Sequence, residues 1–402
     1  MFIGGNLTNL RILHGYSRKQ LSNMLGVTEQ AVWQYENNYT SPKMKVVNDL
    51  KSIFNVKSKY FYKQDVLTRY FKADNIPFMN IAYRSKMMNV IYKTQTEAKH
   101  VEYVDSFVNY LTAEVRHPTQ KIIHLRNKII QYLNNTNESR QIQIKEIAKI
   151  ARKGLGLQDN TNDNLMFLVE KSGVFIFEKA IGEEVDAYSL WTNQERPYII
   201  LGNLKRSAVR RNFDIAHELG HLLLHYRVEF TNLDNKEHKV VEDEANQFAS
   251  TFLLPEEPFL SDLQEIYHVT NPDAYIDLKV KWKTSLQVLA YRAANLGVLD
   301  AKNHRNFYAA LHRRGYLKRE PLDETIAIQK PQKVKSIFDL AIKKGLIDMN
   351  QMLDKDWMID LEFLHRITGI DLEFLKRYMK NEQEFGLSKI AYLEPNMLNH
   401  NV

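Results

Sequence analysis

Apolar positions in the first sixty or so residues recur at helical spacing in four short segments that are separated by turn signals. The segments are NLTNLRILHGY, SRKQLSNMLG, TEQAVWQYENN and SPKMKVVNDLKSIFNV. Ser17 and Thr28 have the side chains of N-caps, and Gly26 stands where the second helix would end. Pro42 stands at the start of the fourth segment, where a helix tolerates a missing N–H. The pattern therefore predicts four short helices.

The pattern changes after residue 160. Before it, longer helical periods such as QTEAKHVEYVDSFVNYLTAEV and TQKIIHLRNKIIQYLNN predict further helices. After it, a short helix, LMFLVEKSG, precedes three β-like runs, VFIFEK, DAYSLW and PYIILG. Long helices are predicted at about 206–226 and 239–254, the second ended by Pro255, and the last eighty or so residues are again helical. We expect a mainly α chain with a small β-sheet.

The length of 402 residues predicts several domains, since one domain usually takes roughly 100–200 residues. We expect an all-α domain at 1–65, a helical connector at 66–160, an α+β domain at 161–320 and a helical C-terminal region at 321–402. No apolar run approaches the roughly 18–20 residues of a membrane span, and the N-terminus lacks the pattern of a signal peptide. We therefore expect a cytoplasmic protein without a membrane partner.

Positive charge is concentrated in the first domain. The whole chain carries a formal charge of +7, and residues 1–65 hold nine Lys and Arg against four Asp and Glu. Most of the excess thus lies in one small segment, which is the electrostatic pattern of nucleic-acid binding.

The stretch HELGH, residues 217–221, carries the most specific chemistry. Residues four apart on a helix lie about 40° apart on one face, so His217 and His221 can reach one metal ion. Glu218 falls beside them, as in the H-E-x-x-H arrangement, where the glutamate acts on water and does not bind the metal. A buried amphipathic helix that carries histidines by chance remains the alternative. Because the chain has no cysteine, any metal must be held by His and carboxylate groups.

A catalytic zinc site needs a third protein ligand. His225 lies roughly 12 Å beyond His217 along a continuous helix and cannot join the same ion. The segment VVEDEANQFASTFLLP offers a carboxylate instead. Its apolar positions define one face of a helix, and at about 100° per residue Glu242 lies near that face, Asp243 points away and Glu244 lies on the flank.

A carboxylate directed into the interior needs a cation or a donor to offset its desolvation. Glu242 is therefore the predicted third ligand. Asn246, one turn later, is predicted to hydrogen-bond His217 or Glu242 from outside the ligand set. In the alternative interpretation, Glu242 is a flanking charge and Asn246 is a cap.

RRNFDIAHELGHLLLH followed by EDEANQFASTFLLP resembles the ImmA/IrrE family of zinc metallopeptidases. DAYSLWTNQERPYIIL resembles the family's sheet, and LKVKWKTSLQVLAYRAANLGVL resembles its downstream segment. The resemblance covers about residues 160–320. It implies a gluzincin-like fold, Zn²⁺, and cleavage of a protein substrate, often a repressor, in phage, mobile-element or stress-response systems. It assigns metal binding to His217, His221 and Glu242, and the catalytic base to Glu218.

Three further residues near these motifs have less specific roles. Tyr188 has the hydroxyl needed to stabilise an oxyanion, but the resemblance implies only an aromatic residue there, so we expect it to pack. His225 and Arg211 are expected to serve structure or substrate contact. All three stay outside the predicted catalytic set.

SRKQLSNMLGVTEQAVWQYENN has the pattern of a helix-turn-helix, with apolar positions facing inward at Leu21, Leu25, Val27, Val32 and Tyr35. About residues 5–62 resemble the Xre-like family of phage repressors. The resemblance implies base contacts by Glu29, Gln30 and Gln34, and phosphate contacts by Arg18 and Asn37.

Trp33, in an exposed register, departs from the Xre-like pattern and would suit a thymine methyl or a partner surface. Because such modules usually bind paired half-sites, we expect a homodimer. A helical protein-interaction module that does not bind DNA is the alternative.

Together the motifs predict a regulator of double-stranded DNA fused to a zinc endopeptidase that acts on a protein. The rival interpretation belongs to another class. In it, the chain is a transcriptional regulator or antitoxin-like protein whose zincin fold is a sensor or binding scaffold with little peptidase activity.

Overall fold

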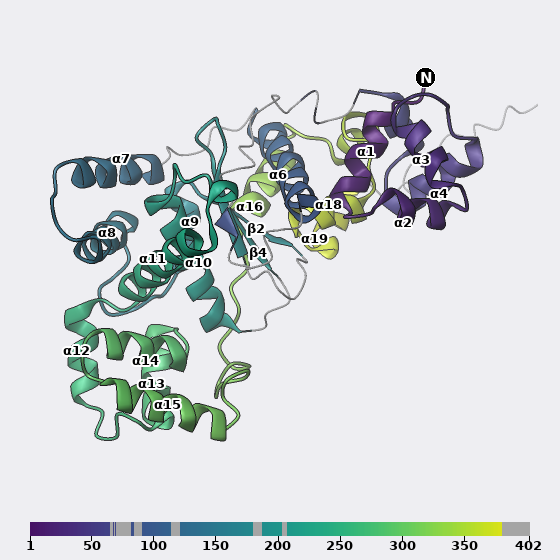
Figure 1. Cartoon of the computed structure of the whole chain (residues 1–402). Coiled ribbons are helices and arrows are strands. Elements are labelled where there is room, and N and C mark those ends of the chain that lie inside the picture. The colour runs from purple at the N-terminus through teal and green to yellow at the C-terminus, as the bar shows by residue number, and fades with distance from the viewer. Residues whose placement is uncertain are drawn as a thin grey trace, which may run out of the picture.

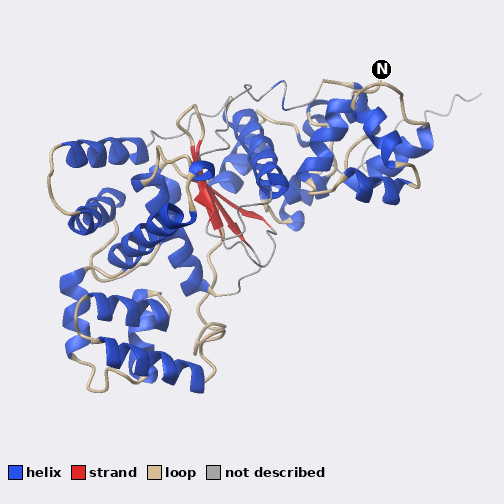
Figure 2. Cartoon of the chain, in the orientation of Figure 1, coloured by secondary structure: helices blue, strands red, loops and turns tan. Residues whose placement is uncertain are grey.

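The computed structural model describes residues 1–64, Leu67, Arg69, 82–83, 91–113, 121–179, 187–202 and 207–379 (Figure 1). Most of this part of the chain is helical, and one small sheet lies between two groups of helices (Figure 2). Its described strands are β1 (Ala82–Tyr83), β2 (Phe175–Lys179), β3 (Ala187–Trp191) and β4 (Pro197–Gly202), in the order β1-β3-β4-β2. β2 runs parallel to β4, and β3 runs antiparallel to both β4 and β1. The predicted fold class, mainly α with a small sheet, is confirmed.

Strand β1 lies where the sequence predicts only helices, so that prediction is wrong at Ala82 and Tyr83. A strand of two residues is too short for an alternating pattern to be recognised. The strand is defined by pairing across about a hundred residues of chain, with Ala82 opposite Ser189 and Tyr83 opposite Tyr188. Such a partner cannot be found from local periodicity.

The second and third of the N-terminal helices begin after the predicted N-caps Ser17 and Thr28, but the fourth begins after Lys43, so the prediction that Pro42 opens it is wrong. The N-terminal helices are α1 (Gly4–Leu13), α2 (Arg18–Leu25), α3 (Glu29–Glu36) and α4 (Met44–Phe54), followed by the 3₁₀-helix η1 (Ser58–Tyr62). The Ser17 hydroxyl accepts a hydrogen bond from the Gln20 N–H, and the Thr28 hydroxyl accepts one from the Ala31 N–H. Gly26 ends α2 at φ 62°, a conformation that favours glycine.

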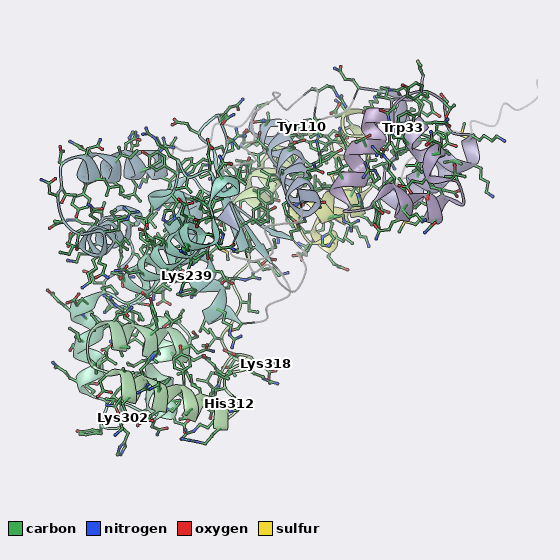
Figure 3. The ribbon with its side chains drawn as sticks, viewed as in Figure 1. Trp33, Tyr110, Lys239, Lys302, His312 and Lys318 are labelled. Carbon is green, nitrogen blue, oxygen red and sulfur yellow. The ribbon has the colours of Figure 1, made fainter. Side chains whose placement is uncertain are left out.

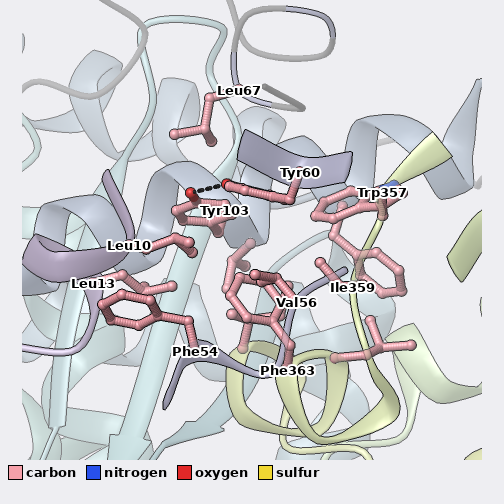
Figure 4. Packing of buried hydrophobic residues seen from close by; sticks show 14 of the residues in the cluster. Leu10, Leu13, Phe54, Val56, Tyr60, Leu67, Tyr103, Trp357, Ile359 and Phe363 are labelled. Carbon is pink, nitrogen blue, oxygen red and sulfur yellow. Dashed lines mark hydrogen bonds between the residues drawn. The ribbon is translucent and has the colours of Figure 1, made fainter. Parts of the chain in front are cut away.

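The core of these helices is shared with the C-terminal region. Besides the N-terminal helices, this core includes residues of α6 (Ile91–Thr112), α16 (Lys333–Lys343), α17 (Met349–Gln351), η5 (Met352–Asp356), α18 (Leu361–Thr368) and α19 (Leu372–Lys376). The Lys57 N–H donates to the Met358 carbonyl at 2.7 Å, and the Tyr60 and Tyr103 hydroxyls lie 2.6 Å apart (Figure 4). The helix-turn-helix is therefore not an isolated bundle, because α6 and the C-terminal helices share its apolar core.

The sheet separates this core from a second one. On β3, Tyr188 packs into the core of the N-terminal helices, whereas Ala187 packs into the other core. The second core is built by α7 (Lys121–Asn134), α8 (Arg140–Leu155), α9 (Leu165–Ser172), α10 (Ala208–Leu224), α11 (Asn235–Leu253), α12 (Glu256–Gln264), α13 (Ile276–Trp282), α14 (Leu286–Asn295) and α15 (Ala301–Arg313). Figure 1 shows α12 to α15 at the end of the molecule away from α1 to α4.

The segment expected as a helical connector contributes to both cores, since α6 packs on one side of the sheet and α7 and α8 on the other. The domain boundaries at 65, 160 and 320 remain predictions. Among the described helices, none combines the length and the apolar character required of a bilayer-crossing segment.

Candidate metal centre

Helix α10 carries the HELGH motif between the sheet and helix α11. His217 and Glu218 have no exposed surface, and His221 is also buried. Strand β3 holds the helix in place, because the Ser189 hydroxyl donates to the Glu218 carbonyl at 3.2 Å and the Trp191 indole N–H donates to the Leu222 carbonyl at 2.9 Å. The motif thus lies in the protein interior on a helix that two hydrogen bonds from β3 hold in place.

Gly220 allows helix α11 to lie close to the motif. A Cβ atom at Gly220 would lie 3.0 Å from a ring carbon of Phe248 and 3.5 Å from the Cα of Ala245. Helix α11 begins after Asp234, whose carboxylate accepts hydrogen bonds from the N–H groups of Lys236 and Glu237. The close crossing turns the inner face of α11, with Glu242 near its edge, towards the histidines.

The structure brings His217, His221 and Glu242 together. The two histidine Nε2 atoms lie 3.0 Å apart, and the Glu242 carboxylate oxygens lie 3.4 Å from His217 Nε2 and 3.3 Å from His221 Nε2. In a tetrahedral zinc site with bonds of about 2.0–2.1 Å, neighbouring ligand atoms lie about 3.3 Å apart. The spacing of these three groups therefore fits one zinc ion, although their role as ligands remains a prediction.

The surroundings of His217, His221 and Glu242 are also suited to a bound cation. The Asn246 side-chain oxygen lies 3.1 Å from His217 Nδ1, so Nδ1–H donates and Nε2 keeps its lone pair. Burial acts to raise the pKa of Glu242, but the imidazoles of His217 and His221 beside it outweigh burial and hold that pKa well below its usual range. A carboxylate and imidazole lone pairs converge on one buried point, and a divalent cation would neutralise their mutual repulsion.

Glu244 and His225 contact the site although the sequence analysis excluded them from it. His225 Nδ1 lies 3.0 Å from His221 Nδ1, and His225 Nε2 lies 3.0 Å from a Glu244 oxygen. The Arg140 guanidinium donates to both Glu244 oxygens, at 2.9 and 2.6 Å. Asp243 is exposed, as predicted. The spacing of four residues that pairs His217 with His221 also pairs His221 with His225, and that signal was available in the sequence.

The same contacts control the protonation of both groups. Burial lowers the pKa of the His225 imidazole to about 4, and the hydrogen bond to Glu244 opposes this shift only in part. Burial acts to raise the pKa of Glu244, but hydrogen bonds from His225 and Arg140 outweigh it and lower that pKa to about 2. At neutral pH, Glu244 is therefore an anion and His225 is neutral.

A cleft of about 400 Å³ lies beside the group. Asn246 links the two, because it lines the cleft and hydrogen-bonds His217. The Phe213 ring, also in the lining, lies 6.2 Å from the His217 ring. Most of its walls come from helices α10, α11, α14 and α15. The lining residues on these helices are Arg210, Phe213, Asp214, Asp243, Asn246, Gln287, Val288, Tyr291 and Tyr308, and Ser285, the N-cap of α14, and Leu317 complete the lining. A space of this size falls within the usual range of ligand-binding pockets.

Tyr188 and Arg211 both make contacts within the fold. Tyr188 is buried in the core on the face of the sheet opposite α10, and its hydroxyl lies 3.5 Å from His100 Nδ1. Arg211 forms an ion pair with Glu178 and donates to the Gln329 carbonyl at 3.2 Å. Tyr188 thus packs, as expected.

On the helix-turn-helix, Glu29 and Gln30 are exposed at the start of α3, and Gln34 is half-buried one turn later. The exposed Asn37 donates from its side chain to the Trp33 carbonyl at 2.8 Å. Arg18, expected to contact phosphate, donates to Glu36 at 2.6 Å. The fold therefore engages the Arg18 guanidinium in an ion pair.

Trp33 lies in the arm of the molecule that holds α1 to α4 (Figure 3). Its ring stacks on Tyr39 at a centroid distance of 5.1 Å, and Tyr39 is 70% exposed. Trp33, the residue that departs from the Xre-like pattern, thus forms an aromatic pair with Tyr39. The DNA contacts assigned to this domain remain predictions.

Two family models match the chain. The model of the IrrE N-terminal-like domain, of the peptidase M78 family, matches residues 169–294, a range that includes β2 to β4, α10 and α11. The helix-turn-helix model matches residues 7–61. No curated protein matches the chain. Both predicted resemblances are confirmed, because the chain joins an N-terminal segment similar to the helix-turn-helix family to a segment similar to the IrrE N-terminal-like domain of the peptidase M78 family.

Proposed function

We propose that the protein is a DNA-binding regulator whose second domain is a zinc-dependent endopeptidase. Its substrate would be a repressor or another regulatory protein of a phage, mobile-element or stress-response system. The observation that carries this proposal is the convergence of His217, His221 and Glu242 on one buried point, with Glu218 next to His217 on the same helix. The match of residues 169–294 to the IrrE N-terminal-like domain supports it.

The residues around this point suit hydrolysis of a peptide bond. Zinc, when bound by His217, His221 and Glu242, supplies the positive charge that polarises the substrate carbonyl and acidifies water. The Glu218 carboxylate accepts the proton of the attacking water and then delivers it to the leaving amine. The cleft beside Phe213 and Asn246 would hold side chains that flank the cut bond.

The helix-turn-helix would bring the peptidase to its target. Helices α1 to α4 share a core with one face of the sheet, and α10 packs on the other face. Binding of the helix-turn-helix to a DNA site would therefore also position the helix that carries the metal-binding motif. A repressor bound to the same DNA nearby would then be present at a high local concentration around the peptidase domain. We propose a homodimer on paired half-sites as the DNA-bound form.

The rival function is a regulator in which the zincin fold only senses or binds. An intact set of motif residues favours the enzyme, because a scaffold has no need of a buried glutamate beside the metal position. Loss of zinc would change DNA binding in the sensor interpretation and proteolysis in the enzyme interpretation. The two functions are therefore separable by experiment.

Removal of zinc is expected to abolish proteolysis. Purified full-length protein, loaded with zinc, is mixed with candidate repressors encoded nearby, and fragments are identified by mass spectrometry. We expect fragments with the loaded protein, none after chelation, and their return when zinc is restored. Intact repressors in all three samples, from a protein that retains zinc and binds DNA, would favour the scaffold.

Gln34→Ala is expected to relax the preference for one base pair at a cost of about 1–3 kcal/mol, because a glutamine can bind adenine through two hydrogen bonds. The full chain is the right material, since the N-terminal core includes C-terminal helices. Binding to the protein's own promoter DNA is measured by fluorescence anisotropy at several salt concentrations. Gln141→Ala, on the exposed surface of α8, is the matched control and should bind as the wild type does. Binding that is absent or insensitive to salt would contradict the DNA-binding proposal.

A further inference from the structure

A continuous path of side chains runs from helix α8 to the metal position. Arg140, the first residue of α8, binds both oxygens of Glu244, which contacts His225, which in turn contacts His221. His225 is only 4% exposed, and the Glu244 side chain is largely covered as well. The path therefore lies mostly within the protein, where hydrogen bonds are not exchanged readily with water.

The order of donors and acceptors along this path follows from its two ends. A carboxylate held by a guanidinium can only accept, so His225 Nε2 must carry a proton. An imidazole with its single proton on Nε2 offers Nδ1 as an acceptor. The 3.0 Å contact between the two Nδ1 atoms needs one donor, and that donor is then His221 Nδ1. The lone pair of His221 is left on Nε2, the atom that lies beside His217 Nε2 and Glu242.

We propose that Arg140, Glu244 and His225 form a hydrogen-bonded relay that keeps the proton of His221 on Nδ1 and so keeps Nε2 free to bind the metal. The proposal rests on the zinc site of the proposed function. It makes Glu244 and His225 positioning residues, since neither reaches the ion. Asn246 has the same effect on His217 through a single hydrogen bond, so helix α11 sets the tautomer of both histidines.

The relay has a polarity that one substitution would reverse. The Glu244 oxygen that His225 contacts also accepts from the Arg140 guanidinium at 2.6 Å, so in Glu244→Gln an NH₂ group at that place donates to His225 Nε2 and gives up one of the two Arg140 contacts. His225 then carries its proton on Nδ1 and donates to His221, whose own proton is displaced onto Nε2. Zinc binding would have to remove that proton or rearrange the path.

We expect Glu244→Gln to weaken zinc binding by about 10–100-fold, the range typical of partners that orient a metal-binding histidine. The control is Glu257→Gln, which makes the same change at an exposed position of α12 outside the cleft lining and should bind zinc within about twofold of the wild type. Affinity is measured by competition with a chromophoric chelator. Equal affinity of Glu244→Gln and Glu257→Gln would overturn the relay.

The tautomer gives a second readout on the wild-type protein. Long-range ¹H–¹⁵N spectra of the metal-free protein should show His221 protonated on Nδ1 and His225 protonated on Nε2, with His225→Gln used for assignment. His221 protonated on Nε2 in the wild type would overturn the relay whatever the variants bind. A wild type that shows the expected tautomers but binds no zinc would contradict the proposed function and leave the relay standing.

Discussion

Glu218→Gln is expected to retain zinc and the fold but to cleave the protein substrate about 10²–10⁴-fold more slowly, the usual contribution of a general base. The glutamine keeps the size of the side chain in a position that has no exposed surface. Its amide, however, cannot accept a proton from water. Zinc content, the thermal unfolding curve and the rate of fragment formation are measured on the same preparations.

Glu257→Gln, an exposed position on α12, is the matched control for this substitution and should cleave at the wild-type rate. Cleavage by Glu218→Gln at that same rate would show that Glu218 does not carry the proton. If neither the wild type nor the variant cleaves any candidate while both bind zinc and DNA, the scaffold interpretation gains support.

The features that the sequence predicts well are those that depend on a single helix. Spacing of four residues puts His217 and His221 on one face of α10, and the rotation per residue along α11 separates Glu242 from the exposed Asp243. The caps at Ser17 and Thr28 are similarly local, because each acts on an N–H three residues away. A regular helix fixes all of these relations before any tertiary contact forms.

The features that the sequence analysis missed depend on contacts between distant segments. Arg140 and Glu244 lie 104 residues apart in the chain, and nothing near either residue shows that α8 packs against α11. The shared core has the same origin, since Met358 and Phe363 reach the N-terminal segment only after the chain has passed through the whole second core. Helical phase puts Glu244 on a flank of α11, and only the fold shows that this flank faces α8 and His225.

Glu242→Ala is expected to lose more than the roughly 10–100-fold in zinc affinity that is typical of outer partners, because it removes a ligand and leaves only two histidines. Glu244→Ala should weaken binding less, by freeing the tautomer of His221, and Asn246→Ala should do so to a similar extent through His217. The four proteins, including the wild type, are dialysed side by side against a weak chelator, and their zinc content is measured. Retention of zinc by Glu242→Ala together with its loss from Glu244→Ala would mean that helix α11 is rotated relative to the described structure and that Glu244, rather than Glu242, is the third ligand.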